Sequence, residues 1–318
     1  MPAPPPLVVT GGAGFLGRLL IDQARRTHSG RRATSIDLVD HPDPTVASVV
    51  ADLAAEPGVL APLLTGGPAT LVHLASVVSS GAEADWSEAC RVNIAGLISL
   101  IEQCRVSGHR HTVVFTSSVA VFGGEFTASP TGDRTKQTPT STYGMTKAIG
   151  ELLIDDATRK GFIDGRTARL PTVIIRPGKP NLAASSFCSG LFREPLQGKV
   201  CLLPVPVETP LVVISPQTAV AGLLALAELP GDALGAMRAI ALPGLSVTVA
   251  QMLDTLERFG GPEARDLVEL RPDAGIAAIV TGWPGRWDDH RARALGLPAD
   301  DTLDTIVTQF TPTPAPEI

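Results

Sequence analysis

The chain has 318 residues, of which 44% are hydrophobic and 18% charged, and its formal net charge is −6. A chain of this length can form a large α/β domain with a smaller lobe. Its net negative charge provides no basic patch that could bind nucleic acid or an anionic membrane. Four scattered cysteines without a CxxC pair predict neither a zinc site nor a disulfide scaffold, and they fit a reducing cytoplasm. We expect neither export nor membrane insertion, because the N-terminus lacks a signal pattern and no apolar run approaches ~20 residues.

A glycine-rich turn follows the first apolar run. Residues 7–9 (LVV) predict a buried strand, residues 10–17 (TGGAGFLG) form the turn, and a helical pattern then continues to residue 26. Gly11 would allow the tight turn, Gly14 would let the backbone approach a pyrophosphate, and Gly17 would let helix and strand pack closely. A purely structural turn is the alternative, but the position after the first strand favours dinucleotide binding.

Carboxylates near the ends of the next two predicted strands are candidates for holding adenosine. Asp37, in the strand over residues 33–40, would accept hydrogen bonds from the ribose hydroxyls, and Asp40 is its rival. The following loop, residues 41–44 (HPDP), has no Lys or Arg for a 2′-phosphate, which favours NAD over NADP. Asp52 ends a third strand over residues 49–53, where it would either meet the adenine amino group or cap a helix.

Small and hydroxyl-bearing residues follow the fourth and fifth predicted strands. Residues 71–75 form the fourth strand, whose end at Ala75 and Ser76 leaves room for a cofactor. Residues 112–115 form the fifth, which leads into a hydroxyl cluster that contains Ser118. A helix over residues 87–107 carries Asn93, which is either solvated or holds a close backbone contact or a water.

The only tyrosine, Tyr143, lies four residues before Lys147 at the start of a helical pattern. This spacing puts both side chains on one helix face. The Lys147 ammonium would therefore lower the pKa of Tyr143, which is near ~10 for a free phenol, and make it a proton acceptor. Taken alone, the pair is better explained as an ordinary helical pair with a packed ring and a solvated amine, because a two-residue pattern recurs by accident. Ser118 upstream, however, could meet Tyr143 at one substrate oxygen.

The pattern predicts an α/β fold with a doubly wound parallel sheet and a smaller C-terminal substrate lobe. A strand over residues 167–176 ends the sheet, and the strand 211–215 and helix 218–229 rejoin the main domain. We assign residues 1–178 and 211–245 to the nucleotide-binding domain, and residues 179–210 and 246–318 to the substrate lobe.

These motifs, in this order and spacing, resemble the extended short-chain dehydrogenase/reductases, which include nucleotide-sugar epimerases and dehydratases. The resemblance implies a Rossmann fold, bound NAD, catalytic roles for Ser118, Tyr143 and Lys147, and a supporting role for Asn93. One departure is Phe122, where many members carry tyrosine. The implied cofactor-binding residues are Gly11, Gly14, Phe15, Leu16, Gly17, Asp37, Asp52, Leu53, Leu74, Ala75, Ser76, Asn93, Tyr143, Lys147, Pro171, Thr172 and Val173.

Several segments, among them residues 77–85, 169–172, 176–181 and 242–248, resemble the branch of this superfamily that oxidises small sugar acids such as D-erythronate. That resemblance implies oxidation of a C2 hydroxyl. An acid substrate needs a cationic or donor-rich seat. The candidate substrate residues are Ser79, Ser118, Tyr143, Arg176, Lys179, Asn181 and Ser185. The alternative for Arg176 is a structural ion pair. No metal site is expected.

Two other functions remain open from the residues. One is a nucleotide-sugar epimerase or dehydratase that keeps NAD bound, although the smaller lobe shows no clear nucleotide-diphosphate site. The other is a non-catalytic NAD sensor or scaffold, which the intact Ser118, Tyr143 and Lys147 set disfavours. The helices near residues 87 and 143 resemble the pair that forms a four-helix dimer interface in this superfamily, so a homodimer is expected. The same helices could equally pack on the sheet or face solvent.

Overall fold

The computed structural model describes residues 4–28, 30–124, 129–179 and 182–310. Its largest element is a seven-stranded sheet in which all neighbouring strands are parallel. The strands across the sheet are β10 (Ala239–Ala241), β6 (Ile163–Leu170), β5 (His111–Ser118), β4 (Thr70–His73), β1 (Leu7–Thr10), β2 (Ala33–Asp37) and β3 (Ala47–Val50). The strand order reverses between β1 and β4, and ligands bind at such switch points beyond the carboxyl ends of the strands.

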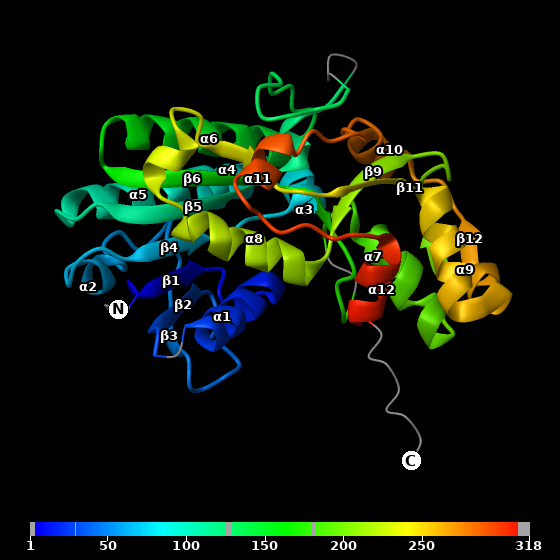
Figure 1. The fold of residues 1–318 in the computed structure, drawn as a ribbon, viewed down its shortest axis with the longest axis horizontal. Coiled ribbons are helices and arrows are strands. Elements are labelled where there is room, and N and C mark those ends of the chain that lie inside the picture. The colour runs from blue at the N-terminus through cyan, green and yellow to red at the C-terminus, as the bar shows by residue number, and fades with distance from the viewer. Residues whose placement is uncertain (1–3, 29, 125–128, 180–181, 311–318) are drawn as a thin grey trace.

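Helices cover both faces of this sheet (Figure 1). On one face, α1 (Phe15–Thr27) and α8 (Pro216–Glu228) pack on Leu7 and Val9 of β1, while α11 (His290–Ala294) lies near β10. On the other face, α5 (Gly96–Val106) and α6 (Thr142–Arg159) pack with α2 (Ala61–Leu64) in the core that contains Val8. Burial on both faces explains the continuous apolar run of β1. The predicted Rossmann-type, doubly wound sheet is confirmed.

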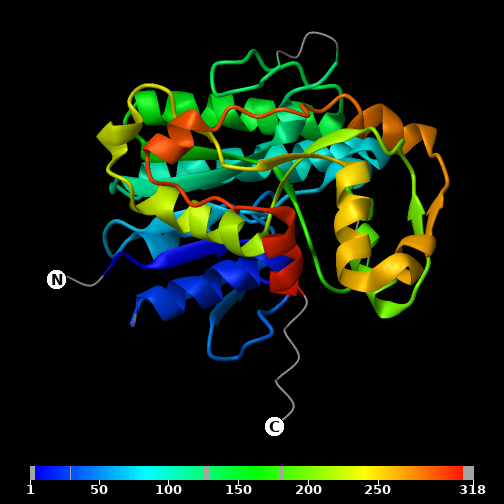
Figure 2. The same ribbon diagram turned by 45° about the vertical axis from the view of Figure 1, so that its right-hand side comes forward.

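A smaller lobe lies beside the carboxyl ends of these strands (Figures 1 and 2). It contains a three-stranded sheet and a two-stranded sheet around a separate apolar core. The strands are β11 (Leu245–Thr248), β9 (Pro210–Ile214) and β7 (Thr172–Val173) in the first sheet, and β12 (Val268–Leu270) and β8 (Cys201–Leu203) in the second. Its helices are α7 (Ser186–Arg193), α9 (Val249–Asp266), α10 (Ala274–Val280) and α12 (Leu303–Phe310).

The structure differs from the sequence prediction where the chain passes between the lobes. The strand predicted over residues 167–176 breaks at Pro171, and the two resulting strands, β6 and β7, belong to different sheets. Proline supplies no N–H to a ladder, which accounts for the break. The predicted strand over residues 211–215 does not join the main sheet, because β9 pairs with β7 and β11. Helix α8 and the unpredicted strand β10 do return to it.

The helix predicted over residues 87–107 is interrupted. After the short α3 (Ser79–Ala84) and α4 (Trp86–Cys90), the chain makes a π-helical turn over Arg91–Ala95 before α5. Such turns accommodate an extra residue and are frequent at functional sites. Here the turn carries Asn93.

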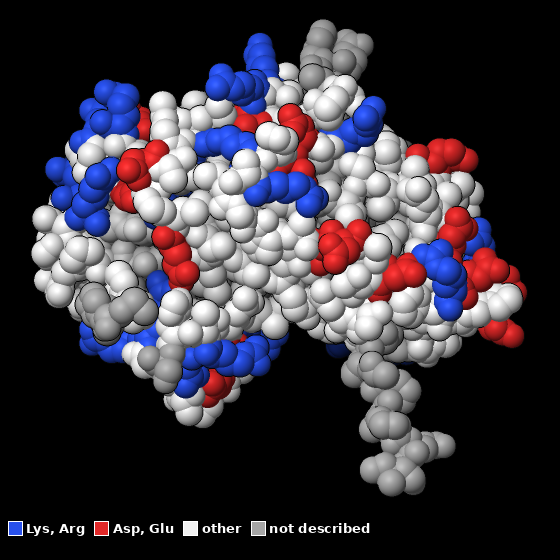
Figure 3. Space-filling model, in the orientation of Figure 1, with Lys and Arg blue, Asp and Glu red and all other residues white. Residues whose placement is uncertain are grey.

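Acidic and basic side chains are interspersed over the face shown in Figure 3. Within the described ranges, no helix is both long and apolar enough to span a bilayer. The same part of the chain holds no group of three or more His, Cys, Asp or Glu side chains arranged to bind a metal ion.

Candidate active site

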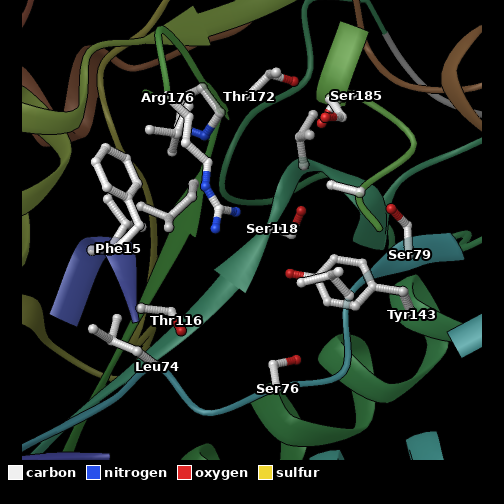
Figure 4. Close-up of a pocket in the computed structure, with 18 of the residues that line it drawn as sticks. Phe15, Leu74, Ser76, Ser79, Thr116, Ser118, Tyr143, Thr172, Arg176 and Ser185 are labelled. Carbon is white, nitrogen blue, oxygen red and sulfur yellow. The ribbon is translucent and has the colours of Figure 1, made fainter. Parts of the chain in front are cut away.

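A cavity of about 340 Å³ lies at the carboxyl ends of the central strands, between the sheet and the smaller lobe (Figure 4). Side chains from both lobes line it. Most of the predicted site residues are brought together here. They are Gly11, Gly14, Phe15, Leu16, Gly17, Leu74, Ser76, Ser79, Ser118, Tyr143, Lys147, Pro171, Thr172, Val173, Arg176 and Ser185.

Other predicted residues lie outside this cavity. Lys179 is exposed and does not line it, and Asn181 falls outside the described residues. Five more predicted residues do not line it either: Asp37, Asp52, Leu53, Ala75 and Asn93.

The glycine turn has the shape that a dinucleotide requires. Gly11 has a φ of +73°, and a Cβ there would lie 2.8 Å from the backbone nitrogen of Ala75. A Cβ at Gly17 would lie 2.3 Å from the Gly11 carbonyl oxygen, so this glycine permits the close approach of helix and turn. A Cβ at Gly14 would meet only that carbonyl oxygen, at 3.1 Å, and would otherwise point into open space at the N-terminus of α1. The turn therefore fits a pyrophosphate group.

The two candidate adenosine carboxylates have different surroundings. Asp37 Oδ2 accepts a hydrogen bond from the Ala13 N–H at 3.0 Å, which places this carboxylate beside the glycine turn. The carboxylate of Asp52 instead pairs with Arg91 at 2.7 Å and accepts the Ala54 N–H at 2.9 Å. Partial burial raises the pKa of Asp52, but the Arg91 hydrogen bond and the backbone hydrogen bonds of the turn together outweigh it and hold this pKa below its usual value.

Asn93 joins the loop after β4 to the helix that carries Tyr143. Its Oδ1 accepts the Val77 N–H at 2.8 Å and the Ser76 hydroxyl at 3.1 Å. Its Nδ2 donates to the Val77 carbonyl and to Thr146 Oγ1, both at 3.0 Å. The buried Asn93 therefore holds a close backbone contact, which was one of the two expectations for it.

Ser118 and Tyr143 lie close together because Gly144, which has no side chain, lets α6 contact the chain after β5. A Cβ at Gly144 would lie only 2.1 Å from the Ala120 carbonyl oxygen, so the first turn of α6 sits directly against the chain after β5. Ser141 caps that turn by accepting the Gly144 N–H at 3.1 Å. Figure 4 shows Ser118 and Tyr143 beside each other in the cavity, where their side chains share a hydrogen bond.

The protonation of the Tyr143 and Lys147 pair differs from the prediction. Burial raises the pKa of Tyr143 to about 12, and the hydrogen bond with Ser118 opposes this rise. Lys147 lies with its ammonium 5.5 Å from the Tyr143 ring centroid and 5.0 Å from that of Phe115, and burial lowers its pKa to about 7. The expected lowering of the Tyr143 pKa by Lys147 is therefore not found, because burial disfavours the charged form of both groups.

Arg176 brings a cationic group into the cavity from the smaller lobe. Its guanidinium lies over the Phe15 ring, 5.6 Å from the centroid, and points toward Ser118 (Figure 4). No described residue accepts a hydrogen bond from this guanidinium. Its backbone is fixed instead, since the N–H donates to Ser189 Oγ at 3.0 Å and the carbonyl accepts from Arg193 at 2.8 Å. Burial, followed by the charge of Arg193, lowers the pKa of Arg176.

Several cavity residues were missed by the sequence reasoning. Thr116 and Ser117 belong to the hydroxyl-rich end of β5, the same local signal that identifies Ser118. Trp283 and the α7 residues had no comparable local signal, because only the packing of the smaller lobe brings them to the cavity. The missed residues are Val78, Thr116, Ser117, Val119, Leu170, Ala183, Ser186, Ser189, Arg193 and Trp283.

Comparison with known proteins agrees with this geometry. Residues 7–210 match the NAD dependent epimerase/dehydratase family. D-erythronate dehydrogenase of Cupriavidus necator is 44% identical over 316 residues, covering 96% of this chain and 97% of that protein. The protein of the same name from Haemophilus influenzae is 40% identical over 314 residues, covering 96% and 98%. The crystal structure of a nucleoside-diphosphate-sugar epimerase from Agrobacterium tumefaciens has a TM-score of 0.89 at 36% identity, covering 96% of this chain and 94% of that one. The chain therefore belongs to the NAD dependent epimerase/dehydratase family.

Proposed function

We propose that this oxidoreductase uses NAD to oxidise the C2 hydroxyl of a small sugar acid, D-erythronate, to the 2-oxo acid. The observation that carries the proposal is one small cavity in which the Ser118 and Tyr143 hydroxyls lie opposite an arginine that has no acceptor among the described residues. The two relatives named D-erythronate dehydrogenase support this choice of substrate.

Membership of the family implies a nicotinamide dinucleotide, and the residues favour NAD over its phosphorylated form. Asp37 presents a carboxylate beside the glycine turn, where it would accept the ribose hydroxyls and repel a 2′-phosphate. Residues 38–44 contain no Lys or Arg that could offset this repulsion.

In the proposed reaction, Tyr143 accepts the proton of the C2 hydroxyl while Ser118 donates a hydrogen bond to the same oxygen. When bound, the oxidised nicotinamide ring supplies the acceptor for the hydride that leaves C2. Arg176 holds the substrate carboxylate by charge-assisted hydrogen bonds. Because burial raises the pKa of Tyr143 to about 12, ionisation of this phenol depends on positive charge in the filled cavity, to which Lys147 contributes.

An epimerase acting on a nucleotide sugar is the second candidate, since the similar Agrobacterium structure carries such a name. The two relatives named D-erythronate dehydrogenase, at 44% and 40% identity over nearly the whole chain, favour the four-carbon acid over a nucleotide sugar. A non-catalytic sensor is disfavoured because such a protein has no need of the Ser118, Tyr143 and Lys147 arrangement.

The deciding experiment is a screen of four-carbon sugar acids and nucleotide sugars with NAD and with NADP. The absorbance of the reduced cofactor measures net reduction of the cofactor in each reaction. We expect D-erythronate with NAD to give net NADH, and Tyr143→Phe to lower kcat by about 10²–10⁴-fold. Turnover of a nucleotide sugar without net NADH would establish the epimerase instead. Full activity of Tyr143→Phe would contradict the proposed proton acceptor.

A further inference from the structure

A buried polar cluster lies behind the catalytic hydroxyls and has no role in the mechanism above. Its centre is Glu151 on α6, whose side chain is only 4% exposed. Arg169 of β6, 5% exposed, donates to this carboxylate through Nη2 at 2.7 Å and Nε at 3.0 Å. The hydroxyl of Ser117 donates at 2.5 Å and the amide of Gln137 at 2.6 Å. Four donor groups from three separate segments therefore meet on one carboxylate.

The position of Glu151 gives the cluster a connection to the active site. Glu151 follows Tyr143 and Lys147 at intervals of four residues, so the three side chains form one stripe along α6. Ser117 immediately precedes Ser118 at the end of β5. The hydrogen bond between Ser117 and Glu151 thus ties the helix that carries Tyr143 to the strand end that carries Ser118.

The strand that supplies Arg169 also leads directly into the cavity wall. Leu170 and Pro171, which follow Arg169, both line the cavity. Arg169 is held from its other side as well, since its Nη1 donates to the Asp133 carbonyl at 2.9 Å and its guanidinium lies 5.0 Å from the Phe122 ring centroid. Phe122, which replaces the tyrosine common in the superfamily, is therefore part of the support for this ion pair.

Stability alone does not account for such a cluster. Burying an ion pair is often no more favourable than burying apolar side chains of the same size, because both charges lose their hydration. The directional, charge-assisted hydrogen bonds do fix the relative positions of the elements that supply them. That matters here because misplacing reacting groups by about 1 Å can lower a rate by about 100-fold.

We propose that Glu151 is a positioning residue that sets the separation of the Ser118 and Tyr143 hydroxyls, acting through Ser117 and α6. This inference rests on the proposed function, because it assumes that those two hydroxyls meet at the substrate oxygen. It predicts a loss in turnover without a matching loss in binding.

Ser117→Ala tests the inference with a small change, because it removes one hydroxyl and leaves the Glu151–Arg169 ion pair in place. We expect kcat to fall by about 10–100-fold, while KM for D-erythronate and Kd for NAD stay within about twofold. The basic group seen in the pH profile of kcat should also titrate at higher pH, because the hydrogen bond with Ser118 lowers the pKa of Tyr143. Glu151→Gln, measured in parallel, should reproduce the same pattern with a larger loss.

Ser107→Ala is the matched control. The Ser107 hydroxyl bonds the His111 ring nitrogen at 2.8 Å at the opposite end of β5, so its loss should lower Tm without changing kcat or the pH profile. If Ser117→Ala and Glu151→Gln lower kcat no more than this control does, the cluster is only structural and the inference is wrong. That outcome remains distinct from failure of the proposed function, in which Tyr143→Phe would keep wild-type turnover.

Discussion

At the scale of single residues, burial determines the chemistry of the site. Lys147 is 2% exposed, and its pKa falls to about 7, whereas the pKa of Tyr143 rises to about 12. Both shifts disfavour the charged form, as expected when a group leaves water. The spacing of the two residues identifies them, but only their surroundings set the direction of the shifts.

The lowered pKa of Lys147 predicts a pH dependence of stability in the cofactor-free protein. Between pH 7 and about 10 the unfolded chain holds more protons on this lysine than the folded chain, so the contribution of Lys147 to the free energy of unfolding should rise with pH, by at most ~1.4 kcal/mol per unit. In urea unfolding at pH 7, 8 and 9, the slope of the free energy of unfolding against pH should therefore be more positive in the wild type than in Lys147→Met. The exposed Lys160→Met variant should behave as wild type, and identical slopes for all three proteins would contradict the prediction.

Substitutions at Arg176 and Lys179 test where the substrate carboxylate binds. Arg176 reaches into the cavity, whereas Lys179, three residues on, is exposed outside it. We expect Arg176→Met to raise KM for D-erythronate by about 100-fold, because it removes charge-assisted hydrogen bonds. Lys179→Met should leave KM unchanged. Initial-rate kinetics of the two variants decide the matter, and an unchanged KM in both would remove Arg176 from the proposed substrate site.

At the scale of elements, the chain uses local irregularities to build the site. The π-helical turn after α4 gives Asn93 its reach to both Val77 and Thr146, and Arg91 of the same turn holds Asp52. The apolar spacing predicts an unbroken helix over these residues. Such a helix would not let Asn93 contact Val77 and Thr146 while Arg91 holds Asp52. The backbone contacts of Gly11, Gly17 and Gly144 likewise bring elements closer than a side chain would allow.

Gly14 and Gly17 should respond differently to the same substitution. Gly14→Ala should keep the fold and weaken NAD binding by about tenfold, because its Cβ would enter the open side of the turn where a pyrophosphate approaches. Gly17→Ala should lower the free energy of unfolding by about 1–3 kcal/mol, because its Cβ would meet backbone at 2.3 Å. Calorimetric titration with NAD and urea unfolding measure the two effects. Equal losses of stability in both variants would contradict this division of roles.

At the scale of the whole molecule, the site exists only where the two lobes meet. The sheet domain contributes the glycine turn, Ser118 and the Tyr143 helix, and the smaller lobe contributes Arg176 and α7.

The helices that cover one face of the main sheet leave apolar side chains exposed, namely Trp86, Ile98 and Leu152. Exposed apolar groups on neighbouring helices favour the expected homodimer, which stays a prediction.

Leu152→Asp should weaken this dimer, because it would place a charge in an apolar interface. We expect a dissociation constant about 100-fold higher, equivalent to ~2.7 kcal/mol, measured by sedimentation velocity over a range of concentrations. Leu270→Asp is the control, since Leu270 is similarly exposed but lies on β12 of the smaller lobe. A monomeric wild type, or equal effects of both changes, would count against an interface on α4, α5 and α6.

The sequence by itself determined the fold class, the glycine turn and the Ser118, Tyr143 and Lys147 set, because strand patterns, glycine spacing and an i, i+4 pair are local properties of the chain. Only the tertiary structure decided which strands share a sheet. Pro171 separates β6 from β7, and β9 pairs with β7 and β11 instead of joining the main sheet. It also decided the pKa shifts, the exclusion of Lys179 from the cavity, and the presence there of Arg193 and Trp283. Each of these depends on burial and on contacts between residues far apart in the chain, which no local pattern contains.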